Sequence, residues 1–276
     1  MPQQPKTVGL LSALTFCLSA AAAFDASAQA VNVRPWLGVA MLGDAPGQGA
    51  RVAHVVRASP AERAGLREGD RVTRVARTSI VRREDVVRTV AGLTVGDVVE
   101  VAFLRAGKEQ IARATLTSLP SSDALMRMEL VGTSAPPWSG VDGVSGAFPE
   151  SIGSLRGRVV ILDFWATWCT PCRIVAPKLS ALQSRYGAQG LTVLGLSTED
   201  AEKVAVFARR TAIGYAVGVD SRAETTHAYG VGSLPTLVVI DKRGVVRDVS
   251  IGYDPAEDAA VETTIRGLLA EPAFPD

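Results

Sequence analysis

The feature that most limits the possible folds of this chain is an apolar segment that runs directly into two closely spaced cysteines. Residues 158–166 read RVVILDFWA, and Cys169 and Cys172 follow in the run TWCTPCRIVAP. A nearly continuous apolar run of this length is typical of a strand buried on both faces. Beyond the cysteines, apolar residues recur at helical spacing as far as Gly187. The pattern predicts a buried strand that leads into a helix, with the cysteine pair at the junction.

Residues 1–30 have the pattern of a signal peptide. Lys6 is the only charged side chain ahead of the apolar run VGLLSALTFCLSAAAA, and small residues stand at Ala28 and Ala30. A basic start, an apolar stretch and small residues at the end match the preference of signal peptidase. We expect cleavage after Ala30 and a periplasmic or otherwise exported mature protein. An uncleaved membrane anchor is the alternative, although the apolar run is short for a span.

Few chemical roles are open to the cysteine pair. Of the three cysteines, Cys17 lies in the predicted signal peptide, which leaves Cys169 and Cys172. A structural zinc site needs about four nitrogen or sulfur ligands, and the only histidines, His54 and His227, are distant in the sequence. A disulfide across so short a loop would stabilise the fold little. We therefore expect a redox couple, with neither a metal nor another cofactor.

Residues 31–120 are predicted to form a small domain of mixed structure that is rich in β-strands. Runs rich in Val, Ile and Thr alternate with turn signals, as in RVAHVV, DRVTRVA and DVVEVAFLR. A hairpin is predicted to turn at Ala106-Gly107. Ser59-Pro60 predicts the start of a short helix. A second helix is predicted within residues 81–93, with Val86, Val87 and Val90 on one face.

The order WLGV, SPAERAGLREGD, helix, VGDVVEVAFLRAGK resembles the PDZ domains of bacterial periplasmic proteases. The resemblance weakens at residues 76–80 (ARTSI), where those domains usually carry an Asn-Gly or Asp-Gly turn. Protease activity is not implied, because the chain has no GxSxG motif and no histidine suitably placed for a triad.

The PDZ resemblance implies a site for the C-terminus of a peptide, which would add as a strand beside the first strand of the domain. Backbone N–H groups of the preceding loop would bind the terminal carboxylate. The matching positions are Trp36, Leu37 and Gly38 in the loop, Val39 and Ala40 in the strand, and Val86 and Val90 along the groove. A PDZ domain that binds no peptide and only spaces or docks the other domain is the alternative.

Residues 120–150 are rich in Pro, Gly and Ser and show no apolar periodicity, so we predict a linker at residues 121–128. The second domain would cover residues 129–276. After Gly157, strand patterns alternate with helix patterns and end in a hairpin and a last helix. This alternation predicts a sheet with helices on both faces.

The segments LDFWATWCTPCRIVAP and GVGSLPTLVVID resemble the thioredoxin superfamily. VGTSAPPW and LRGRVVILDFWATWC make the chain more similar to the exported TlpA-like thiol–disulfide oxidoreductases within it. The resemblance implies a PDZ domain followed by an α/β thioredoxin fold. Two positions depart from the family pattern. Val175 stands where TlpA-like proteins often carry Glu, and Leu234, before the proline of SLPT, is not a hydroxyl residue.

The resemblance also implies roles for individual residues. Cys169 would attack a partner disulfide and Cys172 would resolve the mixed disulfide. Asp163 would be a buried acid that accepts a proton from the resolving thiol. The residues implied to face the client are the cis-proline Pro235, Leu234 before it, and Trp168 beside the first cysteine.

The predicted function is an exported thiol–disulfide oxidoreductase that reduces client proteins, with the PDZ domain recruiting partners. No histidine lies between the cysteines to stabilise a thiolate further, which favours a reductant. A thiol oxidant and a non-catalytic PDZ scaffold are the alternatives. A peroxidase is disfavoured, because Ala166 stands where peroxiredoxins carry Thr. The expected partners are clients with disulfides or thiols and an electron donor or acceptor protein. A net charge of +1 without basic blocks gives no reason to propose nucleic acid.

Overall fold

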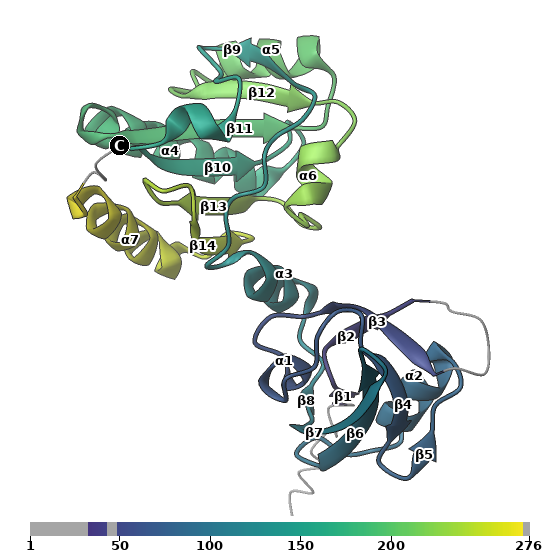
Figure 1. Cartoon of the computed structure of the whole chain (residues 1–276). Helices are drawn as coiled ribbons and strands as arrows, with labels where there is room; N and C mark the ends of the chain where they lie inside the picture. The colour runs from purple at the N-terminus through teal and green to yellow at the C-terminus, as the bar shows by residue number, and fades with distance from the viewer. Residues whose placement is uncertain (1–32, 43–48, 273–276) are drawn as a thin grey trace, which may run out of the picture. The chain divides into compact units, whose positions relative to one another are not determined.

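The computed structural model describes residues 33–42 and 49–272, and Figure 1 shows the whole chain. The predicted signal peptide, residues 1–30, lies outside the described residues. Within the described ranges, two domains follow one another along the chain: a β-rich first domain and an α/β second domain. No helix in these ranges is long and apolar enough to cross a membrane.

The first domain is built around an antiparallel sheet with the strand order β2-β3-β4-β6-β7, in which β5 pairs with β4. Its strands are β2 (Val39–Met41), β3 (Ala50–Val55), β4 (Arg71–Val75), β5 (Thr78–Ser79), β6 (Val98–Arg105) and β7 (Lys108–Thr115). A separate pair is formed by β1 (Pro35–Trp36) and β8 (Thr117–Ser118). The helices are α1 (Pro60–Arg63) and α2 (Arg83–Ala91).

Local sequence explains two features of this domain. Ser59 caps α1, because its side-chain oxygen accepts a hydrogen bond from the backbone N–H of Glu62 at 3.1 Å. Ala106 and Gly107 turn the β6–β7 hairpin with φ angles of 50° and 76°. Two left-handed residues in succession give a turn whose twist matches that of the paired strands. The predicted helix start and the predicted hairpin are confirmed.

The buried face of α2 differs from the prediction at one position. Val86 and Val90 are only 4% and 7% exposed, whereas Val87 is 68% exposed. Successive residues lie about 100° apart around a helix, so Val86 and Val90, four residues apart, point to the same side. Val87 is turned about 100° away from Val86 and leaves that side. The prediction that Val87 lies on the buried face is wrong.

The sheet of the second domain has the order β14-β13-β10-β11-β12-β9. The central strands β10, β11 and β12 are parallel, and the other three run antiparallel to their neighbours. The bounds are β9 (Val141–Ser145), β10 (Val159–Phe164), β11 (Leu191–Ser197), β12 (Ala216–Asp220), β13 (Thr236–Ile240) and β14 (Val246–Ile251). The buried strand before the cysteines and the C-terminal hairpin are confirmed. No strand had been predicted at β9 or β12.

Helices cover both faces of this sheet, as predicted (Figure 1). The helices are α3 (Ser122–Leu130), α4 (Thr170–Tyr186), α5 (Ala201–Arg210), α6 (Glu224–Ala228) and α7 (Asp258–Ala270). Short 3-10 helices occupy Ile152–Leu155, Gly187–Gln189 and Pro255–Glu257. Side chains alternate between the faces of β10. Ile161 lies in the core under α4, α5 and α7, and Leu162 lies in the opposite core with α3.

The segment predicted as a linker, residues 121–128, is helical rather than irregular. Ser121 caps α3 by accepting a hydrogen bond from the backbone N–H of Ala124 at 3.2 Å. Met126 and Leu130 are buried in the core of the second domain. These two apolar residues, one helical turn apart, were too weak a periodic signal to predict the helix.

Candidate functional site

The cysteine pair lies where β10 leads into α4, as the sequence predicts. Cys169 is the N-cap of the 17-residue helix α4, and its sulfur accepts a hydrogen bond from the backbone N–H of Cys172 at 3.2 Å. The two cysteines form a disulfide with an S–S distance of 1.97 Å and a Cα–Cα distance of 5.3 Å. The unpaired N–H groups and the dipole at a helix N-terminus stabilise a thiolate at the first cysteine once the disulfide is reduced.

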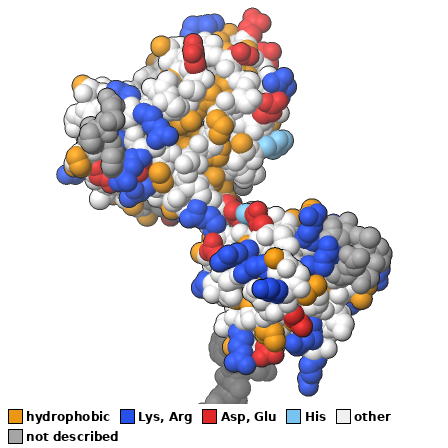
Figure 2. All heavy atoms as spheres, in the orientation of Figure 1, with side chains coloured by type: hydrophobic (Ala, Val, Ile, Leu, Met, Phe, Trp, Pro, Cys, Tyr) orange, Lys and Arg blue, Asp and Glu red, His pale blue; other side chains and the backbone are white. Residues whose placement is uncertain are grey.

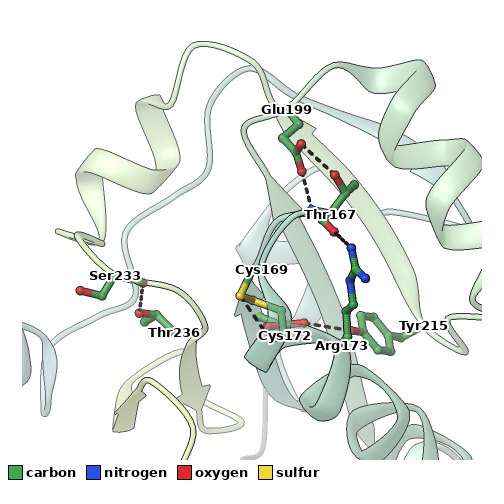
Figure 3. The surroundings of a disulfide bond; sticks show 9 residues. Thr167, Cys169, Cys172, Arg173, Glu199, Tyr215, Ser233 and Thr236 are labelled. Atoms are coloured by element: carbon green, nitrogen blue, oxygen red, sulfur yellow. Dashed lines mark hydrogen bonds between the residues drawn. A yellow bond between two sulfur atoms is a disulfide. The ribbon is translucent and has the colours of Figure 1, made fainter.

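The segment before β13 contains the predicted cis-proline. The Leu234–Pro235 peptide bond is cis, which confirms that prediction. The hydroxyl of Thr236 donates to the carbonyl of Ser233 at 2.8 Å, a contact drawn in Figure 3. The carbonyl of Pro235 accepts a hydrogen bond from the N–H of Gly252 at 2.8 Å. These bonds hold the segment on both sides of the cis bond.

The loop before Cys169 is held by a second set of contacts, which the sequence analysis missed. The carboxylate of Glu199 accepts hydrogen bonds from the backbone N–H and the hydroxyl of Thr167, at 2.5 and 2.9 Å. The carbonyl of Thr167 accepts a hydrogen bond from the Arg173 guanidinium at 2.8 Å (Figure 3). Burial raises the pKa of Glu199, but hydrogen bonds from Lys203 and Thr167 outweigh it and leave that pKa lower than usual. An ionised carboxylate therefore holds this loop.

Asp163 is the most strongly perturbed carboxyl group near the cysteines. It is 1% exposed and follows Ile161 by two positions in β10, so it points to the same face as the core that contains both cysteines. Burial raises the pKa of Asp163 to about 7, and a hydrogen bond from the Tyr215 hydroxyl opposes that rise. The Tyr215 hydroxyl donates to Oδ2 at 2.8 Å, whereas Oδ1 has no hydrogen-bond partner among the described residues. The predicted burial of this acid is confirmed.

A groove of about 490 Å³ is lined by residues of the loop before Cys169 and of the segment before Pro235, and neither cysteine lines it. Trp168 lines it from the loop before Cys169, and Ser233 and Leu234 line it from the segment before Pro235. Trp168 is 66% exposed, whereas Trp165 is 3% exposed and lies in the core.

The loop implied to bind a carboxylate in the first domain is tightly packed at Gly38. Gly38 has a φ of +88°, and an added Cβ would lie 2.2 Å from Cβ of Ser59, so only glycine fits. The carbonyls of Leu37 and Gly38 accept hydrogen bonds from the N–H groups of Ala61 and Val56.

The other PDZ positions divide between the sheet edge and the core. Val39 begins β2, and among the described strands β2 pairs only with β3, so one side of it is a sheet edge to which a peptide strand could add. Trp36 ends β1, directly before this loop, and Ala40 is the second residue of β2. Val86 and Val90 are buried in the core of the domain.

The described residues contain no group of three or more Cys, His, Asp or Glu side chains that could hold a metal ion. On the face drawn in Figure 2, Lys and Arg side chains are interspersed with acidic and apolar ones.

Comparisons with known proteins give a match to each of the two domains. A PDZ domain model matches residues 35–116, and the model of the AhpC/TSA family matches residues 131–249. A thiol-disulfide oxidoreductase ResA of Geobacillus kaustophilus is 33% identical over 129 residues, which are 46% of this chain and 73% of that protein. The ResA of Geobacillus thermodenitrificans is 36% identical over 104 residues, 37% of this chain and 60% of that protein.

The similar solved structures include one from Chlorobium tepidum. A thiol:disulfide interchange protein of Chlorobium tepidum, described as a thioredoxin family protein, is 32% identical. The match covers 50% of this chain and 97% of that one, with a TM-score of 0.44.

The fold and the site define a thioredoxin-fold protein with a vicinal cysteine pair and an N-terminal PDZ domain. More specifically, the chain belongs to the thiol–disulfide oxidoreductases of the TlpA-like branch of the thioredoxin superfamily.

Proposed function

We propose that the protein is an exported thiol–disulfide oxidoreductase that reduces disulfides of client proteins. The observation that carries the proposal is the cysteine pair at the N-terminus of α4. A buried carboxyl group, Asp163, points from β10 into the core that contains both cysteines, and a cis-proline lies in the segment beside the groove. A solely structural disulfide would not explain a buried acid with a pKa near neutrality.

The first step is attack by the Cys169 thiolate on a client disulfide. A new S–S bond forms between Cys169 and the client, and the second client sulfur leaves as a thiolate. The N-terminus of α4 favours the thiolate at Cys169. Leu234 and Trp168 line the groove in which the client chain would lie.

The second step resolves the mixed disulfide. Asp163 accepts the proton of the Cys172 thiol, and the Cys172 thiolate attacks the sulfur of Cys169. The bond to the client breaks, the client leaves with both sulfurs reduced, and the enzyme retains the Cys169–Cys172 disulfide. Two electrons have moved from the enzyme to the client. A dithiol donor must return them before the next turnover.

The direction of electron flow is tested by the reduction potential of the couple. Trp168 adjoins Cys169, so tryptophan fluorescence can follow the dithiol–disulfide equilibrium across defined redox buffers. A potential near that of thioredoxin, about −270 mV, would support the reductant, and one near about −120 mV would make the protein an oxidant. A chain that shows no reversible transition would overturn the enzyme proposal in favour of the scaffold.

The PDZ domain would recruit the client or the electron partner by its C-terminus. The edge of β2 and the tight loop at Gly38 support this role. Removing residues 31–120 should lower the rate for a recruited protein client and leave the rate for a small aromatic disulfide unchanged. Equal rates for every protein client with and without the PDZ domain would contradict recruitment.

Secretion of the chain from a bacterial host and sequencing of its mature N-terminus would test export and cleavage after Ala30.

A further inference from the structure

Tyr215 is a buried tyrosine that the reaction described above does not use. It precedes β12 directly and is 6% exposed. Its hydroxyl donates to Oδ2 of Asp163 at 2.8 Å, and Figure 3 shows this hydrogen bond reaching from the Tyr215 ring. A tyrosine whose hydroxyl contacts the buried acid of a redox site is placed to affect the proton on that acid.

The neighbouring strand leaves room for this contact. β11 lies between β10 and β12, so the Tyr215 side chain has to pass over β11 to reach Asp163. Gly195 of β11 is the residue paired with Asp163. A Cβ added at Gly195 would lie 3.0 Å from Cε2 of Tyr215 and 2.9 Å from Nε1 of Trp165. The missing side chain at Gly195 is therefore what allows the tyrosine to lie across the strand.

We propose that Tyr215 is a positioning residue whose hydroxyl holds Oδ2 of Asp163 and leaves Oδ1 to exchange a proton with the Cys172 thiol. The inference rests on the proposed role of Asp163 as the base of the resolving step. In that step the S–H bond of Cys172 breaks and an O–H bond forms at Oδ1, and no electrons are transferred. Oδ1 is the buried oxygen for which the described residues supply no partner in the disulfide form.

Tyr215 acts as a donor throughout. Burial and the Asp163 charge raise the pKa of Tyr215 well above its ordinary range, so the hydroxyl keeps its proton. A donated hydrogen bond stabilises the carboxylate more than the acid. Tyr215 therefore lowers the pKa of Asp163 relative to burial alone. The carboxylate, which is the form able to accept a proton, thus persists to a lower pH.

The surroundings of Asp163 provide few competing groups. β11 and β13 place Gly195 and Leu237 opposite it, and neither side chain titrates. From α4, the titratable groups in or packed against the same core are the two cysteines and Tyr186. Burial and the Tyr215 hydrogen bond are the two causes that act on the pKa of Asp163. A change at Tyr215 should therefore be seen directly in the titration of this one carboxyl group.

The test is a titration of the Asp163 side-chain carboxyl by carbon NMR in the oxidised full chain, compared with Tyr215→Phe. Loss of the hydroxyl should raise the titration midpoint by about one pH unit, a tenfold change in proton affinity. Gly195→Ala should shift it in the same direction, because the new Cβ displaces the Tyr215 ring. The matched control is Tyr229→Phe: Tyr229 is also buried, but it lies in the opposite core and donates to the carbonyl of Pro136.

A second readout follows the resolving step in the reduced protein. A symmetrical aromatic disulfide releases one thiolate when Cys169 attacks and a second when Cys172 resolves. The pH dependence of the second release should show an inflection that Tyr215→Phe moves upward, that Tyr229→Phe leaves in place and that Asp163→Asn abolishes.

The outcomes separate the two proposals. An unchanged NMR midpoint in Tyr215→Phe would overturn the role of Tyr215, and Asp163 would remain the base if Asp163→Asn still removed the inflection. An inflection that survives in Asp163→Asn would overturn the base role and the Tyr215 inference with it. Parallel shifts of the midpoint and the inflection in Tyr215→Phe, both absent in Tyr229→Phe, would support the inference.

Discussion

Glu199 accepts two hydrogen bonds from Thr167, one from its backbone N–H at 2.5 Å and one from its hydroxyl at 2.9 Å. Thr167 lies two residues before Cys169, so this one carboxylate holds the loop that leads into Cys169. Lys203 pairs with the same carboxylate at 2.5 Å from one turn into α5. The loop before Cys169 is thus tied to the segment between β11 and α5, which is distant in sequence.

Glu199→Ala should loosen this loop. Two hydrogen bonds to a charged acceptor are lost, and the buried N–H of Thr167 is left without its partner, so we expect a loss of about 2 kcal/mol in the free energy of unfolding. The attack of Cys169 on an aromatic disulfide should slow several-fold. Urea unfolding and stopped-flow thiol kinetics measure the two effects. Glu202→Ala, an exposed carboxylate in α5, is the control and should change neither.

Asp163 should make the stability of the fold depend on pH. Burial raises its pKa from 3.8 to about 7, so the folded chain binds a proton that the unfolded chain has already released between these pH values. The contribution of Asp163 to the stability of the folded state is therefore largest below about pH 4, and it is lost as the pH rises through about 7. The full difference is on the order of 4 kcal/mol.

Asp163→Asn removes this dependence. The stability of the variant relative to the parent chain should be higher at pH 8 than at pH 4.5, as measured by urea unfolding at each pH. Asp142→Asn changes an exposed carboxylate of β9 and serves as the control. Parallel stability curves for the parent chain and Asp163→Asn would contradict the raised pKa.

The parts of the site that could be predicted are those formed by short contiguous stretches of the sequence. The strand, the two cysteines and the helix start lie within residues 158–187, and Pro235 was recognisable from its SLPT context. The burial of Asp163 followed from its apolar neighbours Leu162 and Phe164. Alternation along a buried strand and the chemistry of a helix N-terminus are local rules, so a sequence reveals them directly.

The parts that could not be predicted depend on contacts between distant residues. Tyr215 lies 52 residues from Asp163, and Glu199 lies 32 residues from Thr167. Nothing in the sequence around a tyrosine or a glutamate indicates which partner it meets after folding. β12 escaped prediction for a related reason, because Gly218 interrupts its apolar run and sheet pairing overrides the weak strand propensity of glycine.

Gly38→Ala should disrupt the loop of the PDZ domain. The left-handed φ of +88° disfavours alanine, and its Cβ would lie 2.2 Å from Cβ of Ser59, so we expect a loss of about 3 kcal/mol or more. Gly65→Ala is the matched control, since Gly65 has a φ of +83° but no atom within 4 Å of an added Cβ. It isolates the backbone strain and should cost only about 1–2 kcal/mol. Hydrogen exchange of the amides in β3 reports on this domain alone. Equal losses of stability in the two variants would mean that the close contact with Ser59 adds no cost beyond the backbone strain.

Trp168→Ala should weaken client binding without weakening the fold. The side chain is 66% exposed and lines the groove beside the cis-proline, so its removal takes little from the core but removes an aromatic surface that a client would cover. We expect the KM for a disulfide-containing peptide to rise about fivefold to tenfold, with unfolding by urea unchanged. Val87→Ala, an equally exposed residue of the first domain, should alter neither quantity. A fall in kcat at constant KM would instead indicate that Trp168 acts on the cysteines themselves, because it would then affect the transition state and not the binding of the client.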